Sequence, residues 1–196
     1  MRTFRVLLCG WLLGGAVLVI WSAVAAPTAP VEPPASVGPA GALKPAAFGD
    51  LLIPVVGVEA SDLHDDYAQP RSGGRTHAAI DILAPRGTPV VAAVDGTVRK
   101  LFSSKAGGIT IYEFDRDERR VYYYAHLDSY ANGLAEGLAV RQGTVLGYVG
   151  TTGNAPPGTP HLHFAIEDLP PTKEWWKGSP VNPYPLLTTT RVSALR

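Results

Sequence analysis

Residues 88–102, TPVVAAVDGTVRKLF, contain two short apolar runs separated by the pair Asp95-Gly96. An Asp-Gly pair between such runs is a strong signal for a β-hairpin, because its residues accept the positive φ of a tight turn. No stretch after residue 50 keeps a helical period for ten residues. Five further short segments are rich in β-branched or aromatic residues and bounded by turn formers: 51–58, 109–115, 119–127, 144–150 and 161–167. We therefore predict one all-β domain over residues 50–169.

The start of the chain has the pattern of an export signal. Arg2 and Arg5 precede an uncharged apolar run that ends in Ala-Val-Ala at residues 23–25. This order predicts an apolar helix that serves as a secretory signal peptide over residues 1–25. The alternative is an uncleaved inner-membrane anchor, because the run is as long as the ~20 residues that span a bilayer. Both interpretations place the remaining chain outside the cytoplasm, in the periplasm or cell envelope.

Two further segments flank the predicted domain. Residues 26–49 are dominated by Pro and Ala and show no apolar periodicity, which predicts an extended spacer. Residues 170–196 contain Pro170-Pro171 and the sequence NPYP at 182–185, and we expect them to form an irregular tail packed on the domain.

Composition argues against nucleic-acid binding and against sites built from cysteine. The chain of 196 residues carries 17 Lys and Arg against 17 Asp and Glu, so its net charge is zero. Nucleic-acid binding is therefore not expected, since phosphate contacts need clustered basic residues. The single cysteine, Cys9, can form neither an internal disulfide nor a thiolate zinc site. Any metal must therefore be held by histidines and carboxylates. Separately, we expect the protein to be a monomer.

Four of the five histidines lie in three short motifs, THAAID, AHL and HLH. One histidine alone is usually structural, but the HLH pair is more informative. On a strand, residues i and i+2 share a face, so His161 and His163 point the same way and their Cα atoms lie about 6–7 Å apart. Two imidazoles on one face suit metal binding or acid–base chemistry.

His77 and Asp81 of THAAID are candidates for the other half of a metal site. On an extended strand their Cα atoms would lie about 13 Å apart, which is too far for the two side chains to share one ion. If they share a metal, the chain between them must curl, and the small Ala78-Ala79 pair allows this. Histidine, carboxylate and histidine form a standard catalytic zinc set, which leaves a fourth position for water.

These motifs occur in the order of a known family. The segments LLIPVVGV, PRSGGRTHAAIDILAPRGTPVVAAVDGTV, YYYAHL and GTVLGYVGTTGNAPPGTPHLHF resemble the lysostaphin-like, LytM-type zinc endopeptidases of bacterial cell walls. The resemblance covers residues 51–169 and implies a twisted antiparallel sheet with one zinc ion in a groove between loops. It further implies that His77, Asp81 and His163 bind the metal and that His126 and His161 form the catalytic pair.

The sequence departs from the family pattern at two places near these residues. Ala79 stands where the family usually has glycine, and residues 63–74 replace a common segment of the groove wall. Neither change removes a ligand. Some relatives have lost ligands and act as metal-free amidase activators, so a non-hydrolytic envelope regulator is the alternative to an active enzyme. The expected substrate is peptidoglycan, and the favoured bond is the D-alanyl–diaminopimelate cross-link.

Three other features have two interpretations each. Tyr124 alternates in phase with His126 and either lines the groove or packs outward. Trp175 and Trp176 are either a tail anchor or a platform for sugar rings. His64, next to Asp65 and Asp66, belongs to a solvated loop or to a second metal site.

Overall fold

The computed structural model of this protein describes residues 51–189. Between these residues no helix has the length and apolar character needed to cross a membrane. The predicted helix at residues 1–25 and the predicted spacer at 26–49 lie outside the described residues, and they stay predictions.

Strands dominate the described residues, as the short apolar segments predict. The elements in chain order are η1 (Ala60–Asp62), β1 (Pro70–Arg71), η2 (Ser72–Gly74), β2 (Arg75–Thr76), β3 (Ile80–Leu83), β4 (Pro89–Val91), β5 (Gly96–Ser104), β6 (Gly108–Asp115), β7 (Arg120–Tyr130), β8 (Ala139–Val140), β9 (Val145–Val149), β10 (His161–Asp168), β11 (Ser179–Val181) and α1 (Pro183–Thr188).

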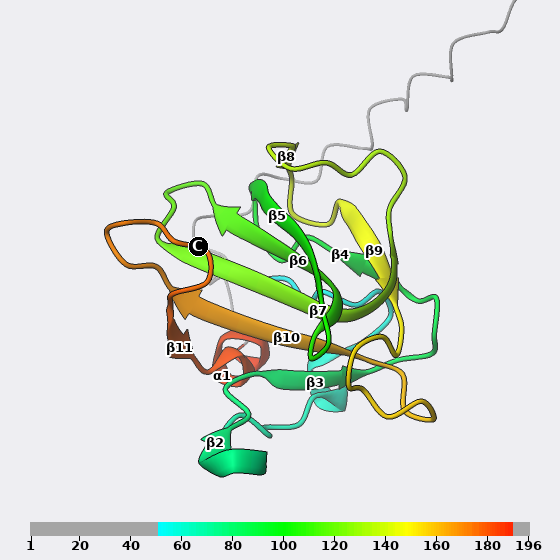
Figure 1. Cartoon of the computed structure of the whole chain (residues 1–196). Coiled ribbons are helices and arrows are strands. Elements are labelled where there is room, and N and C mark those ends of the chain that lie inside the picture. The colour runs from blue at the N-terminus through cyan, green and yellow to red at the C-terminus, as the bar shows by residue number, and fades with distance from the viewer. Residues whose placement is uncertain (1–50, 190–196) are drawn as a thin grey trace, which may run out of the picture. The chain divides into compact units, whose positions relative to one another are not determined.

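Nine strands form one antiparallel sheet, which confirms the predicted antiparallel β fold (Figure 1). Its main path runs β11-β10-β7-β6-β5-β8, with β3 also paired to β10, and β9 paired to β7 and β4. The β-hairpin predicted at Asp95-Gly96 is therefore wrong, because β4 pairs with β9 whereas β5 pairs with β6 and β8. Gly96 serves instead the close approach of β6, since a Cβ atom there would lie 2.2 Å from the backbone oxygen of Phe114. The long strand β7 joins two parts of the sheet, because residues 120–125 pair with β10 whereas residues 127–130 pair with β9.

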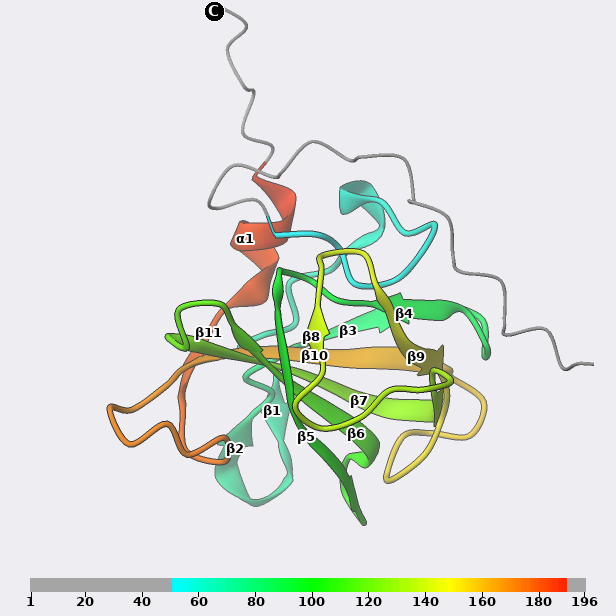
Figure 2. The same ribbon diagram turned by 90° about the horizontal axis from the view of Figure 1, so that it is seen from above.

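The two faces of the sheet have different surroundings. Alternation on β10 sends Leu162, Phe164 and Ile166 into the core, where each has no exposed surface. His161 and His163 therefore point to the other face, which we call the site face. Figure 2 shows α1 on the core side of β10 and the β1–β2 hairpin on the opposite side.

The described part of the C-terminal segment contains regular structure, so the predicted irregular tail is wrong for these residues. β11 pairs with residues 166–168 of β10, and α1 follows it. The helix starts here because Asn182 Oδ1 accepts the backbone N–H of Tyr184 at 2.9 Å and Pro183 supplies a preset φ. The sequence NPYP is thus a helix start rather than a sign of irregular chain.

Candidate metal centre

Strand pairing brings Asp81 and His163 together. The two residues are direct partners in the β3–β10 ladder, so their side chains stand next to each other on the same face. Asp81 Oδ1 lies 3.0 Å from His163 Nδ1. This pairing joins two motifs that are 82 residues apart in sequence.

His77 reaches the same point because the chain curls just after it. Ala78 has a φ of 55°, in the left-handed region, so the backbone turns before β3 begins at Ile80. The curl that a metal shared by His77 and Asp81 would need is therefore present at Ala78. His77 Nε2 lies 3.0 Å from Asp81 Oδ1 and 3.0 Å from His163 Nδ1.

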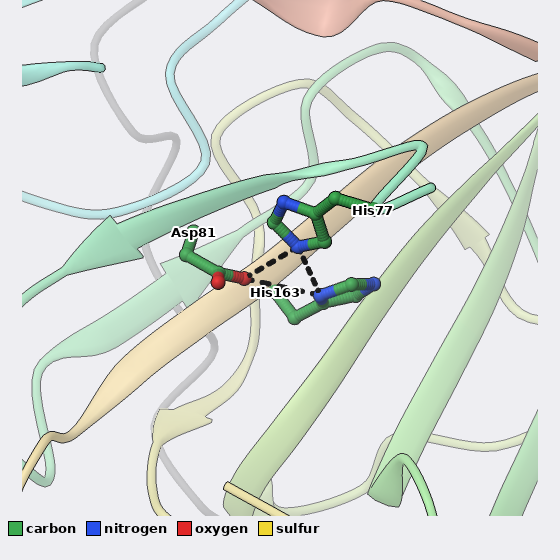
Figure 3. A group of neighbouring side chains, drawn as sticks. All are labelled: His77, Asp81 and His163. Carbon is green, nitrogen blue, oxygen red and sulfur yellow. Dashed lines mark hydrogen bonds and ion pairs between the residues drawn. The ribbon is translucent and has the colours of Figure 1, made fainter. Parts of the chain in front are cut away.

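The three side chains converge on one point, as Figure 3 shows. Their three potential ligand atoms lie 3.0 Å from one another. Tetrahedral zinc with ligands at 2.0–2.1 Å would separate them by about 3.3 Å, so the donor set fits this ion with only a small expansion. The side chains of Asp81 and His163 remain 21% and 22% exposed, which leaves room for a fourth ligand from solvent.

Two residues that were not predicted to belong to the site hold these side chains in place. His77 Nδ1 lies 3.2 Å from the backbone oxygen of Asp66 and 3.4 Å from its carboxylate, which fixes the ring with Nε2 toward the centre. Arg71 donates to Asp81 Oδ2 at 2.9 Å, so Oδ1 remains directed at the two histidines. Asp66 therefore supports the first centre, and its position does not indicate a second one.

The electrostatics of the three side chains are strongly coupled. Burial disfavours a charged His77, yet hydrogen bonds to Asp66 and Asp81 raise the pKa of its imidazole to about 9. Burial likewise opposes ionisation of Asp81, but hydrogen bonds to His163 and His77 hold its pKa well below the usual range. Burial lowers the pKa of His163. A cation that binds here must therefore displace a proton from His77.

His126 and His161 form a second pair beside the first three residues. Their ring centroids lie 5.0 Å apart, and the His126 ring lies 5.6 Å from that of His163. His126 Nδ1 donates to the Thr152 carbonyl at 2.8 Å, and His161 Nδ1 donates to the Thr159 carbonyl at 2.8 Å. Because a carbonyl can only accept, Nδ1 carries the hydrogen in both rings, and a neutral ring keeps its lone pair on Nε2. Burial lowers the pKa of His126 to about 4, so this ring is neutral near pH 7.

The other residues singled out in the sequence lie elsewhere. Tyr124 is fully buried in the hydrophobic core, so both interpretations of this residue are wrong, and it neither lines the site nor packs outward. Tyr123 takes the place beside the centre, with its ring edge-on to His163 at 6.0 Å.

Comparison with known proteins agrees with this arrangement. Residues 75–183 match the family described as Peptidase family M23, which is more than half of the 196 residues. The chain belongs to peptidase family M23. The resemblance to lysostaphin-like enzymes is thus confirmed, and the matched M23 region includes His77, Asp81, His126, His161 and His163.

Three proteins illustrate what the chain is similar to. The chain is 37% identical over 121 residues to the L-Ala--D-Glu endopeptidase of Bacillus subtilis, which covers 59% of this chain and 35% of that protein. It is 39% identical over 110 residues to the DD-carboxypeptidase/endopeptidase Mpg of Neisseria meningitidis, which covers 56% of this chain and 22% of that protein. The catalytic domain of lysostaphin from Staphylococcus simulans matches with a TM-score of 0.52 at 28% identity, covering 61% of this chain and 86% of that one. The chain thus spans about a third or less of the length of these two curated relatives.

Proposed function

We propose that this protein is a zinc-dependent endopeptidase that hydrolyses amide bonds in the cross-link peptides of peptidoglycan. The observation that carries the proposal is the convergence of His77 Nε2, Asp81 Oδ1 and His163 Nδ1 within 3.0 Å of one another. The histidine pair beside them, His126 and His161, supplies the groups that amide hydrolysis needs for proton transfer.

The proposed mechanism divides the work between two groups of residues. His77, Asp81 and His163 would hold one zinc ion, which supplies Lewis acidity toward a carbonyl and a water molecule. In its neutral form, each of the rings of His126 and His161 directs an Nε2 lone pair away from the carbonyl that accepts the Nδ1 hydrogen. A ring that accepts a proton at Nε2 becomes a donor there, so the same pair can deprotonate water and then hydrogen-bond the oxyanion.

The favoured bond is the D-alanyl–diaminopimelate cross-link. The Mpg protein of Neisseria meningitidis is named for DD-carboxypeptidase and endopeptidase activity, which supports this choice. The Bacillus subtilis relative is named for cleavage between L-Ala and D-Glu, a bond inside one stem peptide. Both bonds must therefore be offered in the test.

We further propose that the protein acts in the cell envelope as a monomer. Residues 1–25 would serve as the signal or anchor, residues 26–49 as the spacer and residues 50–169 as the catalytic domain, with 170–196 packed on it. Mass spectrometry of the mature protein tests the first part. A chain that begins at Ala26 is secreted, a chain that retains Met1 is anchored, and a purely cytoplasmic pool contradicts export.

The deciding experiment offers three purified substrates side by side. They are a cross-linked muropeptide dimer, an uncross-linked stem peptide that contains the L-Ala–D-Glu bond, and a pentaglycine peptide. Release of monomers from the dimer, abolished by a chelator and restored by zinc, supports the proposed reaction. Cleavage of the stem peptide or pentaglycine alone contradicts the bond assignment, and cleavage of none favours the non-hydrolytic regulator.

A further inference from the structure

A row of aromatic rings begins at the candidate metal centre and crosses the site face. The ring of Tyr123 on β7 meets His163 edge-on, with centroids 6.0 Å apart. Tyr123 and Tyr112 are direct partners in the β6–β7 ladder, and their ring centroids lie 4.7 Å apart. Each step away from His163 therefore moves one strand along the sheet, from β10 to β7 and then to β6.

The loop between β10 and β11 extends this row. The Trp175 ring lies 4.6 Å from that of Tyr112 and 5.7 Å from that of Phe102 on β5. The ring of Trp176 stands edge-on to that of Trp175, with the ring centroids 5.2 Å apart. We call Tyr123, Tyr112, Trp175, Trp176 and Phe102 the aromatic row.

Packing of the fold explains only part of the row. Trp175 does fix the loop to the sheet, as a tail anchor would. Trp176, however, is 58% exposed and Phe102 is 41% exposed. Among the described residues, the main hydrophobic core and the side chains packed against it include no member of the row. Exposed aromatic rings grouped in this way are typical of a binding surface.

The charged side chains near Trp176, at the outer end of the row, indicate which kind of ligand this surface suits. Lys177 Nζ lies 3.1 Å from Glu174 Oε1, and Thr172 donates to the other carboxylate oxygen at 2.8 Å. These charges on either side of the tryptophan pair compensate each other. An anionic lipid surface is therefore less suited to this place than a neutral ligand with flat, C–H-rich faces.

We propose that the aromatic row binds sugar rings of the peptidoglycan glycan strand, an inference that rests on the proposed function. One face of a pyranose ring presents C–H groups with partial positive charge, and these stack on the negative face of an aromatic ring. The peptides that the enzyme would cleave are attached to such a strand. A row that leads from exposed Trp176 to His163 holds the strand while the attached peptide reaches the metal centre.

The first test measures binding of a defined sugar polymer, the β-1,4-linked hexamer of N-acetylglucosamine, by calorimetry with the full chain. We expect Trp176→Ala to weaken binding about tenfold, which corresponds to about 1.4 kcal/mol. Trp176→Phe should restore part of the affinity, since it keeps an aromatic face. The matched control is Leu186→Ala, which removes a 39% exposed apolar side chain from α1 on the core side of the sheet.

The second test separates this inference from the proposed function. Hydrolysis is measured on intact sacculi and on a cross-linked peptide dimer without sugars, and the ratio of the two rates should fall about tenfold in Trp176→Ala. An unchanged ratio, no binding of the hexamer by the wild type, or Trp176-dependent binding to phosphatidylglycerol vesicles instead would overturn the inference. A wild-type protein that binds the hexamer yet cleaves neither substrate would contradict the proposed hydrolysis alone.

Discussion

Tyr124 and His126 lie two residues apart on β7, yet their side chains are on opposite faces of the sheet. The β6–β7 register passes from Ile109↔Leu127 to Ile111↔Tyr124, so two residues of β7 oppose one residue of β6. This bulge, together with a φ of 61° at His126, turns the imidazole to the site face while Tyr124 enters the core. A regular strand would have put His126 on the core face with Tyr124.

The buried end of Tyr124 contacts an unusual carboxyl group. Tyr124 Oη donates to Glu113 Oε2 and accepts the backbone N–H of Ala93 at 2.9 Å. Glu113 has no exposed surface, and its Oε1 has no hydrogen-bond partner. Burial raises the pKa of Glu113 to about 8, so the side chain is largely protonated near pH 7.

Glu113→Gln should therefore flatten the dependence of stability on pH. The carboxyl group ionises near 4.5 in the unfolded chain and near 8 in the folded one. The wild type thus loses several kcal/mol of unfolding free energy as pH rises between these values, at about 1.4 kcal/mol for each unit of pKa. Urea unfolding at about pH 5 and about pH 8 measures this difference for both proteins.

The control for that prediction is Glu118→Gln, which neutralises an exposed glutamate in the β6–β7 turn. It should leave the wild-type pH dependence in place. If Glu113→Gln shows the same loss of stability between about pH 5 and about pH 8 as the wild type, then Glu113 is already ionised in the folded protein.

Asp66→Ala should weaken zinc binding about tenfold, because metal ligands lose affinity when the group that orients them is removed. The substitution deletes the carboxylate 3.4 Å from His77 Nδ1 and leaves the backbone oxygen in place. Asp65→Ala is the matched control, since this neighbouring carboxylate contacts Asn182 and the Tyr67 N–H instead. Competition with a chromogenic chelator gives both affinities, and equal values for the two variants would assign Asp66 to the loop alone.

The sequence was sufficient for the parts of this site that depend on local spacing. His161 and His163 share a face because strand alternation is a local property, and the need for a curl between His77 and Asp81 follows from the same geometry. The sequence could not show that Ala78 makes this curl with a positive φ. Nor could it show that Asp81 faces His163, because ladder register depends on long-range pairing.

The features that the sequence did not predict correctly also have specific physical causes. Alternation placed Tyr124 in phase with His126, and the bulge in β7 breaks that alternation. Asp66 and Arg71 lie in a segment without periodicity, and only the folded chain brings them to His77 and Asp81. The Asn182-Pro183 pair, a cap followed by proline, is a local signal for a helix start, although the neighbouring prolines favour an irregular tail.

His163→Ala should lose both zinc and hydrolysis, because two remaining ligands hold the ion poorly. Metal analysis of the purified variant gives the stoichiometry, and muropeptide release gives the activity. Tyr123→Phe is a useful companion, since it keeps the ring that contacts His163 and should keep the metal. Normal zinc content in His163→Ala would contradict the ligand assignment.

His126→Ala and His161→Ala should retain zinc and lose hydrolysis by about 10²–10⁴-fold, the usual contribution of a general acid–base group. Neither ring belongs to the convergent set of three, and each is held at Nδ1 by a backbone carbonyl rather than by a ligand residue. Metal content and dimer cleavage are measured on the same preparation, so that loss of the ion is separated from loss of proton transfer. If the two residues act as one unit, the double variant should be no slower than the slower single variant. A wild-type rate in His126→Ala would make that ring structural, whereas loss of zinc from either variant would place it among the ligands.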